Sequence, residues 1–408
     1  MKILIVSQNF WPESFRSNDI AFELAKRGYK VDVLAGIPDY PEGFYYKGYG
    51  VFSKRIQTIN GIKIYRALSI SRGQNKKWRL ALNYLSFAFF GSIWAFFMSL
   101  FKKYDCVIVH APSPVTQALP AVLVKKMMRI PLLSWVLDLW PEAMQSGAGI
   151  NNKHILSIVD EFVKFIYTNS DKILIGSEEF EPIISKKGDF KKKIEYFPNW
   201  YDDLLIMPKN YPIPKLPEGF IIMLAGNLGI SQNLDAVLQA ALEMKDDKMI
   251  KWVIVGDGSK KNWVDESIIA LNLQNNVFTL GRFPLEAMPS FFKAADAMLL
   301  TLSGEYSDLK LVVPNRLQSY MAAARPVLAM IDGAAADLIL KTNCGYSVNA
   351  GDYKSLTKTI REKVLLDLNS FEKLGTNGRK YFEKNFQKEN CINNLCQIIA
   401  KEVANLKD

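Results

Sequence analysis

The chain alternates strand-length apolar runs with helix-length segments, and this alternation constrains its fold more than any other feature. In the first half, Lys2–Val6, Val31–Ala35 and Leu132–Leu137 are apolar runs of strand length. Between two of them, Ile20–Arg27 has helical spacing and is followed by Gly28, a residue typical of helix ends. A regular succession of strand and helix predicts an α/β fold with a doubly wound parallel sheet.

The same alternation starts again in the second half of the chain. Phe220–Ala225 reads as a strand and Leu234–Met244 as a helix, and further strands are expected at Trp252–Val255, Val277–Leu280 and Ala297–Thr301. A chain of 408 residues is also long enough for two domains. We therefore expect two Rossmann-like domains that face each other across a cleft.

The boundary between these domains is expected near residue 205. Residues 1–205 would form the first domain and residues 206–384 the second, and a C-terminal helix at about 385–408 would pack back on the first. The Pro-rich stretch Asn210–Pro217 is the predicted linker.

The composition excludes several classes of protein. Four cysteines form no CxxC pair, and only two histidines, His110 and His154, are present, which argues against a zinc site. Residues 1–205 carry 27 Lys/Arg against 19 Asp/Glu, so most of the formal net charge of +10 lies there. No zinc finger or Arg-rich run accompanies this charge, so we expect anionic lipid or phosphorylated ligands as partners and no nucleic acid. The apolar start without a cleavage site favours the cytoplasm.

One segment stands apart from the alternation. Residues 80–101 contain no charged side chain over 22 positions, and basic residues flank them, so that the whole segment runs from 76 to 103. Its length would permit a membrane span. A span would, however, separate two strands of one sheet. We expect instead a helix that is partly buried and offers an aromatic face and basic ends to an anionic membrane surface, with a wholly buried core helix as the alternative.

Three predicted strands of the second half end in glycine-rich turns. Such turns let backbone N–H groups approach a ligand at the carboxyl edge of a parallel sheet, and a helix start behind them favours an anion. The alternative is that these are ordinary turns between strands and helices. The residues expected to bind a donor substrate here are Gly226, Asn227, Gly229, Gln232, Gly256, Gly258 and Arg282.

A second group of candidate donor-binding residues surrounds the predicted helix start at Pro314 and Asn315. Leu317, Tyr320, Met321 and Ala324 have the spacing of a core-facing side, which leaves Arg316 and Ser319 on another face near the helix entrance. An Arg cation and the helix dipole would stabilise a diphosphate there, with Lys310 as a second cation and Glu305 nearby. Because the chain has no DxD triplet, we expect no metal and no other cofactor.

Asp138 is the candidate general base of the first half. It follows an apolar strand and lies between Trp135 and Trp140, where burial would raise its pKa. The alternative is that it caps the following turn. Two polar loops at the same sheet edge supply candidate acceptor-binding or phosphate-binding residues, with Asp19 read as a possible helix N-cap. These candidates are Arg16, Asn18, Asp39 and Tyr40.

Nine segments in this order resemble glycosyltransferase family 4, and more narrowly the WbuB-type L-fucosamine transferases of bacterial surface polysaccharide assembly. The resemblance covers essentially the whole chain. The segments are FWPESFRSND (10–19), GIPDYPEG (36–43), APSPVTQALPA (111–121), DLWPEA (138–143), GSEEF (176–180), FPNWYDD (197–203), AGNLGISQN (225–233), VGDGS (255–259) and VPNRLQSYMAAARPVLA (313–329).

The resemblance implies a GT-B fold and a retaining, metal-independent transfer from a nucleotide sugar held by the second domain. It places the nucleobase of the donor near Arg282 and the diphosphate of the donor near Gly226, Gly229 and Arg316. Two departures are present: the family's paired glutamates correspond to Leu311 and Ser319, and a family histidine corresponds to Asp138. The contact to the donor ribose is therefore missing or moved to Glu305.

We therefore expect the chain to be a peripheral enzyme of the inner membrane face. It would move an N-acetylated deoxyamino sugar, such as N-acetyl-L-fucosamine, from a UDP donor. Its acceptor would be a polyprenyl-diphosphate-linked saccharide of capsule or O-antigen biosynthesis. A GT-B-type UDP-sugar epimerase and a non-catalytic scaffold of an assembly complex are the alternatives.

Overall fold

The computed structural model describes residues 1–73, 77–111, 113–201 and 211–406. Two compact units make up the chain: Met1–Phe197 together with Ile392–Asp408, and Pro198–Cys391. The boundary expected at residue 205 and the first linker residue, Asn210, lie outside the described residues, as does Lys76.

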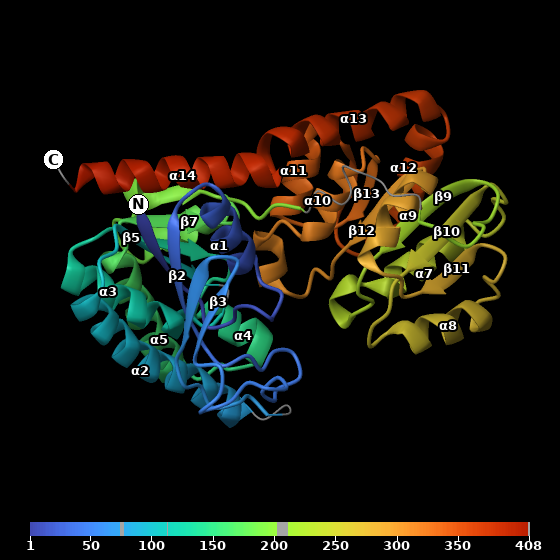
Figure 1. The fold of residues 1–408 in the computed structure, drawn as a ribbon. Coiled ribbons are helices and arrows are strands. Elements are labelled where there is room, and N and C mark those ends of the chain that lie inside the picture. Colours follow the sequence, from blue (N-terminus) through green and yellow to red (C-terminus); the bar gives the residue numbers. More distant parts are fainter. Residues whose placement is uncertain (74–76, 112, 202–210, 407–408) are drawn as a thin grey trace. The chain divides into compact units, whose positions relative to one another are not determined.

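The first unit is built on an eight-stranded sheet with the order β3-β4-β2-β1-β5-β6-β7-β8 (Figure 1). Every neighbouring pair is parallel except β3 and β4, which form an antiparallel edge hairpin. The strands are β1 (Lys2–Val6), β2 (Lys30–Ala35), β3 (Ile56–Ile59), β4 (Ile62–Arg66), β5 (Cys106–Ala111), β6 (Leu132–Val136), β7 (Lys172–Ile175) and β8 (Ile194–Tyr196).

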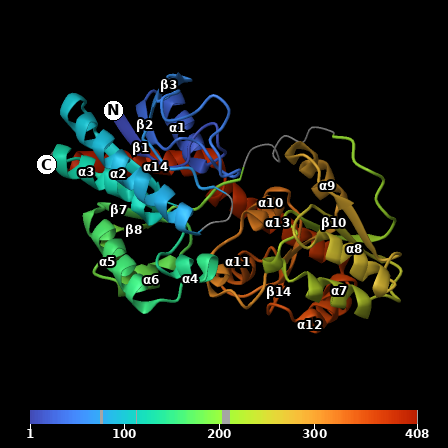
Figure 2. The ribbon, with the colours of Figure 1, turned by 90° about the horizontal axis from the view of Figure 1, so that it is seen from below.

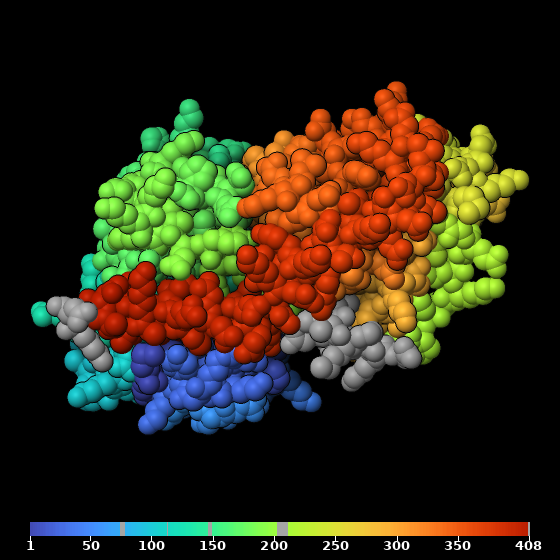
Figure 3. Space-filling view, turned by 90° about the horizontal axis from the view of Figure 1, so that it is seen from above, coloured from blue at the N-terminus to red at the C-terminus, as the bar shows by residue number. Residues whose placement is uncertain are grey.

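Helices cover both faces of this sheet. On one face α3 packs against α2 and α5, and on the other the C-terminal helix α14 lies against segments of the N-terminal half (Figures 2 and 3). An ion pair of 3.8 Å between Lys172 Nζ and Glu402 Oε1 ties α14 to β7. The helices are α1 (Arg16–Lys26), α2 (Lys77–Phe101), α3 (Leu119–Met128), α4 (Glu142–Ala148), α5 (Lys153–Asn169), α6 (Phe180–Lys186) and α14 (Lys388–Asn405).

The second unit has a six-stranded, fully parallel sheet with the order β11-β10-β9-β12-β13-β14. Its strands are β9 (Phe220–Ala225), β10 (Ile250–Val255), β11 (Val277–Gly281), β12 (Ala297–Thr301), β13 (Val327–Met330) and β14 (Gly345–Val348). Its helices are α7 (Leu234–Glu243), α8 (Lys261–Ala270), α9 (Met288–Ala294), α10 (Asn315–Ala322), α11 (Ala334–Thr342), α12 (Tyr353–Thr359) and α13 (Leu368–Asn385).

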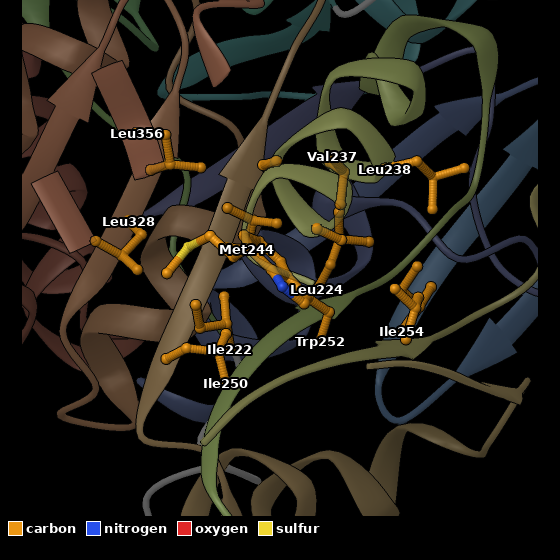
Figure 4. Packing of buried hydrophobic residues seen from close by; sticks show 14 of the residues in the cluster. Ile222, Leu224, Val237, Leu238, Met244, Ile250, Trp252, Ile254, Leu328 and Leu356 are labelled. Carbon is orange, nitrogen blue, oxygen red and sulfur yellow. The ribbon is translucent and has the colours of Figure 1, made fainter. Parts of the chain in front are cut away.

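Two apolar layers sandwich the second sheet because successive strand residues point to opposite faces. Ile222 and Leu224 of β9 join Trp252 in one layer (Figure 4), whereas Met223 and Ala225 lie in the other. Parallel strands covered on both faces are apolar along their whole length, which is why these runs are legible in the sequence.

The predicted α/β class with two doubly wound parallel sheets is confirmed. The prediction that Ala324 faces the core is wrong: α10 ends at Ala322, and Ala324 follows it in a left-handed conformation with φ 55°. The reading of Asp19 as an N-cap is also wrong, because α1 begins at Arg16 and Asp19 lies in its first turn.

Candidate functional site

Three strand ends meet at the carboxyl edge of the second sheet. The backbone N–H of Gly226 donates to Val255 O at 2.8 Å, and that of Gly256 donates to Gly281 O at 2.8 Å. These hydrogen bonds extend the pairing of β9 with β10 and of β10 with β11 to the glycines at the strand ends. The glycine turns after the three strands are therefore held side by side.

A cavity of about 620 Å³ opens over these turns. Three of its lining residues, Val255, Phe283 and Met288, have large apolar side chains. The others contribute glycine backbone and polar side chains. They are Gly226, Asn227, Gly256, Asp257, Gly258 and Arg282.

Gly256 is required by its surroundings. Its φ is 153°, and a Cβ at this position would lie 1.8 Å from Gly226 O. The cavity floor therefore needs two backbones in direct contact, which no side chain permits.

We expect Gly256→Ala to lower the free energy of unfolding by about 2–4 kcal/mol, because the backbone must shift to admit the methyl group. Nucleotide binding should be lost as well. Gly28→Ala is the matched control: its φ is also positive, at 87°, but its Cβ would meet nothing within 4 Å. Thermal unfolding of both variants compares the two effects, and equal stability losses would contradict the close-contact argument.

Arg316 lies against the first of these turns. One of its terminal nitrogens, Nη2, donates to Asn227 O at 2.9 Å, and a Cβ on Gly226 would lie 2.8 Å from Arg316 Nε. The other terminal nitrogen, Nη1, is buried and finds no hydrogen-bond partner among the described residues. A buried N–H without a partner is costly, and Arg316 lies next to Gly226 although it is not itself a lining residue of the cavity. Arg316 is therefore a candidate anion-binding residue.

The entrance of α10 supports the same interpretation. The helix begins at Asn315 directly after Pro314, as predicted, and no described side chain caps it. Ser319 was expected on the same face as Arg316, away from the core, but the two side chains differ in burial. Its side chain is buried and its hydroxyl donates to Arg316 O at 2.7 Å, since a helical serine readily bonds a carbonyl one turn back.

Lys310 has a partner that the sequence did not reveal. Its Nζ forms a 3.0 Å ion pair with Asp332 Oδ2, and Asp332 Oδ1 accepts a hydrogen bond from the Ala350 backbone. The Ala350 N–H and then Lys310 lower the pKa of the Asp332 carboxyl. Lys310 is thus half-exposed and neutralised in this structure, and it would have to leave Asp332 to contact a ligand.

The remaining donor-side candidates differ in their accessibility. Gln232 is buried, and its Oε1 has no partner among the described residues. A Cβ on Gly229 would lie 2.9 Å from the Asn227 side-chain nitrogen. Arg282 and Glu305 are exposed. Arg282 lines the cavity, whereas Glu305 is not among its lining residues.

In the first unit, Glu13 organises the loops after β1 and β2. It is buried, and Oε1 accepts hydrogen bonds from the backbone N–H groups of Asp39 and Tyr40 at 2.9 and 2.7 Å. Its Oε2 accepts from the Phe10 N–H at 3.0 Å. Burial raises the pKa of Glu13, and these backbone hydrogen bonds oppose the rise. This carboxyl joins the two loops, a role that we did not predict.

Asp39 is also structural rather than open to a ligand. It is buried, accepts from the Arg72 N–H at 2.8 Å and from Asn83 Nδ2 at 3.1 Å, and pairs with the Arg72 guanidinium at 3.4 Å. Burial raises its pKa and Arg72 opposes the rise. Arg72 also lies over the exposed ring of Tyr40, with Cζ 5.0 Å from the ring centroid. Tyr40 is accordingly the accessible member of this group.

Arg16 and Asn18 take different positions on α1. Asn18 is buried and braces the preceding loop, accepting from Trp11 N at 3.0 Å and donating to Glu13 O at 2.6 Å. Arg16 is half-buried and pairs with Asp19 at 2.9 Å. The expectation of ligand contact therefore suits Arg16 better than Asn18.

Asp138 lies just after β6, at the same sheet edge. Its Oδ2 accepts a hydrogen bond of 2.7 Å from the Ser113 hydroxyl, and this hydroxyl accepts one of 3.0 Å from Trp140 Nε1. Ser113 and Trp140 therefore position the carboxylate. The predicted rise of its pKa stays a prediction.

His110 at the end of β5 was not among the candidates. It is buried against Trp135, with its Nδ1 3.4 Å from Ser7 Oγ and its Nε2 without a partner among the described residues. Burial lowers its pKa to about 3, so the imidazole is neutral at physiological pH. Its apolar surroundings are formed by residues far apart in the chain, so no local pattern pointed to it.

A known protein family matches most of the second unit. Residues 212–381 match the family of glycosyl transferases group 1. They form a group 1 glycosyltransferase domain. All the donor-side candidates, from Gly226 to Ser319, lie within this domain, and so does the 620 Å³ cavity.

Relatives of the whole chain agree with the group 1 domain. The chain is 24% identical to a protein named as a colanic acid biosynthesis glycosyl transferase, WcaI, of Escherichia coli (strain K12), over 96% of this chain and 98% of that protein. In structure it resembles Anabaena HepE, solved in complex with UDP (TM-score 0.69, 14% identity, 98% and 100% of the two chains). It also resembles sucrose-phosphate synthase of Thermosynechococcus elongatus (TM-score 0.71, 15% identity, 99% of both chains). The chain as a whole, including the group 1 domain, therefore has the GT-B fold.

Proposed function

We propose that this chain is a nucleotide-sugar-dependent glycosyltransferase of surface polysaccharide biosynthesis. The observation that carries the proposal is the buried, unpaired Nη1 of Arg316 beside a glycine-lined cavity in a group 1 glycosyltransferase domain. The full-length similarity to WcaI supports the polysaccharide pathway.

We propose one orientation for the donor in the cavity. Val255, Phe283 and Met288 would form an apolar wall for the nucleobase, and the diphosphate would lie at the turn after β9, next to Arg316. We propose UDP as the nucleotide, supported by HepE, a structural neighbour solved with UDP and with UDP-glucose. With Arg316 and the α10 entrance beside the leaving diphosphate, we propose that no metal or other cofactor takes part.

On the acceptor side, Asp138 would take the proton of the attacking hydroxyl. The hydroxyl oxygen then bonds to the anomeric carbon, the bond from that carbon to the diphosphate oxygen breaks, and UDP leaves with the electron pair. The family 4 resemblance implies retention of the anomeric configuration. The hydroxyl would therefore attack from the same face of the sugar that the diphosphate leaves, because attack from the opposite face would invert the anomeric carbon. For the sugar we propose an N-acetylated deoxyamino sugar such as N-acetyl-L-fucosamine, and for the acceptor a polyprenyl-diphosphate-linked saccharide of capsule or O-antigen assembly, reached from the cytoplasm.

A transfer assay tests this proposal. Purified protein is incubated with radiolabelled UDP-, GDP- and dTDP-sugars and a bacterial membrane lipid extract, and label in the lipid phase is measured. We expect label from a UDP-sugar. An absence of transfer from every donor would contradict the proposal, and inversion at C2 of a free UDP-sugar would establish the epimerase instead.

A further inference from the structure

One face of α2 is apolar and exposed along the whole helix. Its large apolar side chains recur at intervals of three and four, the spacing of one helix face. Phe89 is 62% exposed and Phe101 80%. We call this set the α2 stripe. It consists of Trp78, Leu82, Leu85, Phe89, Ile93, Phe96, Phe97, Leu100 and Phe101.

The opposite face of α2 packs against the rest of the first unit. Phe87 and Ala95 are fully buried, and a Cβ on Gly91 would lie 2.9 Å from Pro120 of α3. The buried Asn83 donates to Ile70 O at 2.6 Å, which holds the first turns of the helix against the sheet edge. The helix also joins β4 to β5 of a single sheet. These contacts argue against a membrane span, and the exposed stripe excludes a wholly buried core helix, although the helix is long and apolar enough to span by composition alone.

Exposed apolar side chains continue beyond α2. The neighbouring helix α3 has the exposed Met127. Helix α5, which packs against α3 (Figure 2), has the exposed Ile155, Ile158 and Phe165. Soluble monomers rarely expose a contiguous apolar surface of this extent without a function. Three neighbouring helices of the first unit therefore carry exposed apolar side chains.

Exposed cations lie at the ends of α2 and α3. Lys103 at the end of α2 and Lys126 and Arg129 at the end of α3 are exposed, and no carboxylate pairs with them in the described part of the chain. The carboxylates nearby are neutralised. Asp160 pairs with Lys187 at 2.7 Å and Glu161 pairs with Lys164, which also contacts Asp160. Asp171 pairs with Lys125 at 2.5 Å.

We propose that the α2 stripe, extended by α3 and α5, is a docking surface for an anionic lipid bilayer. A helix of 25 residues is about 37 Å long, and lying flat it would place its aromatic and aliphatic side chains at the level of the lipid headgroups. The unpaired cations are complementary to anionic headgroups. An uncharged apolar partner would leave these cations without a counterpart.

The same helix reaches the candidate acceptor loops. Asn83 contacts Asp39, and the ring of Tyr84 lies 5.9 Å from Arg72 Cζ. Where the proposed lipid-linked acceptor applies, docking through the α2 stripe would present the lipid headgroup close to these loops. This position of the headgroup rests on the proposed function, whereas the docking surface itself does not.

Vesicle co-sedimentation tests the apolar part of the surface. The full chain is mixed with vesicles of phosphatidylcholine alone or with equal phosphatidylglycerol. We expect binding to the anionic vesicles and a roughly hundredfold weaker partition for Phe89→Glu/Phe97→Glu, because two inserted rings are lost. The matched control Ile269→Glu/Leu366→Glu carries the same charge change on exposed residues of the second unit, 64% and 78% exposed, and should bind normally.

A second pair of variants tests the cations. Lys103→Gln/Arg129→Gln should weaken binding to the anionic vesicles several-fold, and a raised salt concentration should weaken binding of the wild-type chain in the same way. The control pair Lys248→Gln/Lys358→Gln should have no effect.

Failure of the wild-type chain to bind anionic vesicles, or equal binding by both glutamate pairs, would overturn the proposal. So would a dimer in light scattering that Phe89→Glu/Phe97→Glu dissociates, since the stripe would then face a second copy. UDP binding, measured in parallel, should be normal in all variants, which separates failure here from failure of the proposed function.

Discussion

Arg316→Ala is expected to abolish sugar transfer while leaving the fold intact. The guanidinium contacts the glycine turn through Nη2 and keeps Nη1 unpaired beside the cavity. It would stabilise the negative charge that develops on the leaving diphosphate. Removal of one such preorganised donor typically lowers kcat by about 10²–10³. The side chain is only half-buried, so its loss should change the melting temperature little.

Two measurements separate the role of Arg316 from a general effect. Binding of UDP and of uridine is compared by calorimetry, and we expect the variant to lose its preference for UDP while uridine still binds to the apolar wall. Arg361→Ala is the matched control, because Arg361 is 46% exposed and pairs with Glu243 outside the cavity lining. Near-normal turnover of Arg316→Ala would show that the diphosphate binds elsewhere.

Asp138→Asn is expected to lose transfer but keep UDP binding. Asparagine has nearly the same shape and retains an oxygen that can accept the Ser113 hydroxyl hydrogen bond, but it cannot take a proton from an acceptor. The loss of a general base typically costs about 10²–10⁴ in rate. Single-turnover transfer and UDP binding are measured on the same preparation.

The control for this variant is Asp189→Asn, an exposed carboxylate of the same unit. It should behave like the wild-type chain in both measurements. Equal loss of UDP binding by Asp138→Asn would move Asp138 to the donor side. Undiminished turnover would remove its role as a base and leave it as a residue that orders the turn with Ser113 and Trp140.

Much of the fold was predictable because its signals are local. Strands such as Lys2–Val6, Phe220–Ala225 and Ala297–Thr301 were predicted with their observed bounds, since a strand covered on both faces is apolar throughout. The hairpin of β3 and β4 was missed. Its strand β3 lies at the sheet edge, where two of the four residues are exposed and the apolar run is short.

The site was predictable only in part for a related reason. The glycine turns after β9, β10 and β11 follow strand ends, and a parallel sheet brings such ends to one edge, so their meeting at the cavity followed from the pattern. The partners of the charged residues did not. Asp332 neutralises Lys310 from 22 positions away, and Glu13 joins two loops 26 positions apart.

By itself the sequence determined the alternation of strands and helices in both halves, apart from the β3–β4 hairpin. It also determined the glycine turns of the cavity and the presence of a long uncharged helix at residues 80–101. Only the tertiary structure decided which side of that helix is covered, that Ser319 is buried while Arg316 keeps a nitrogen unpaired, and that Asp39 is held by Arg72. The physical reason is the range of the interactions. Strand and helix formation follow from neighbouring residues, whereas the burial of a side chain and the pairing of a charge depend on segments that only the packed chain brings together.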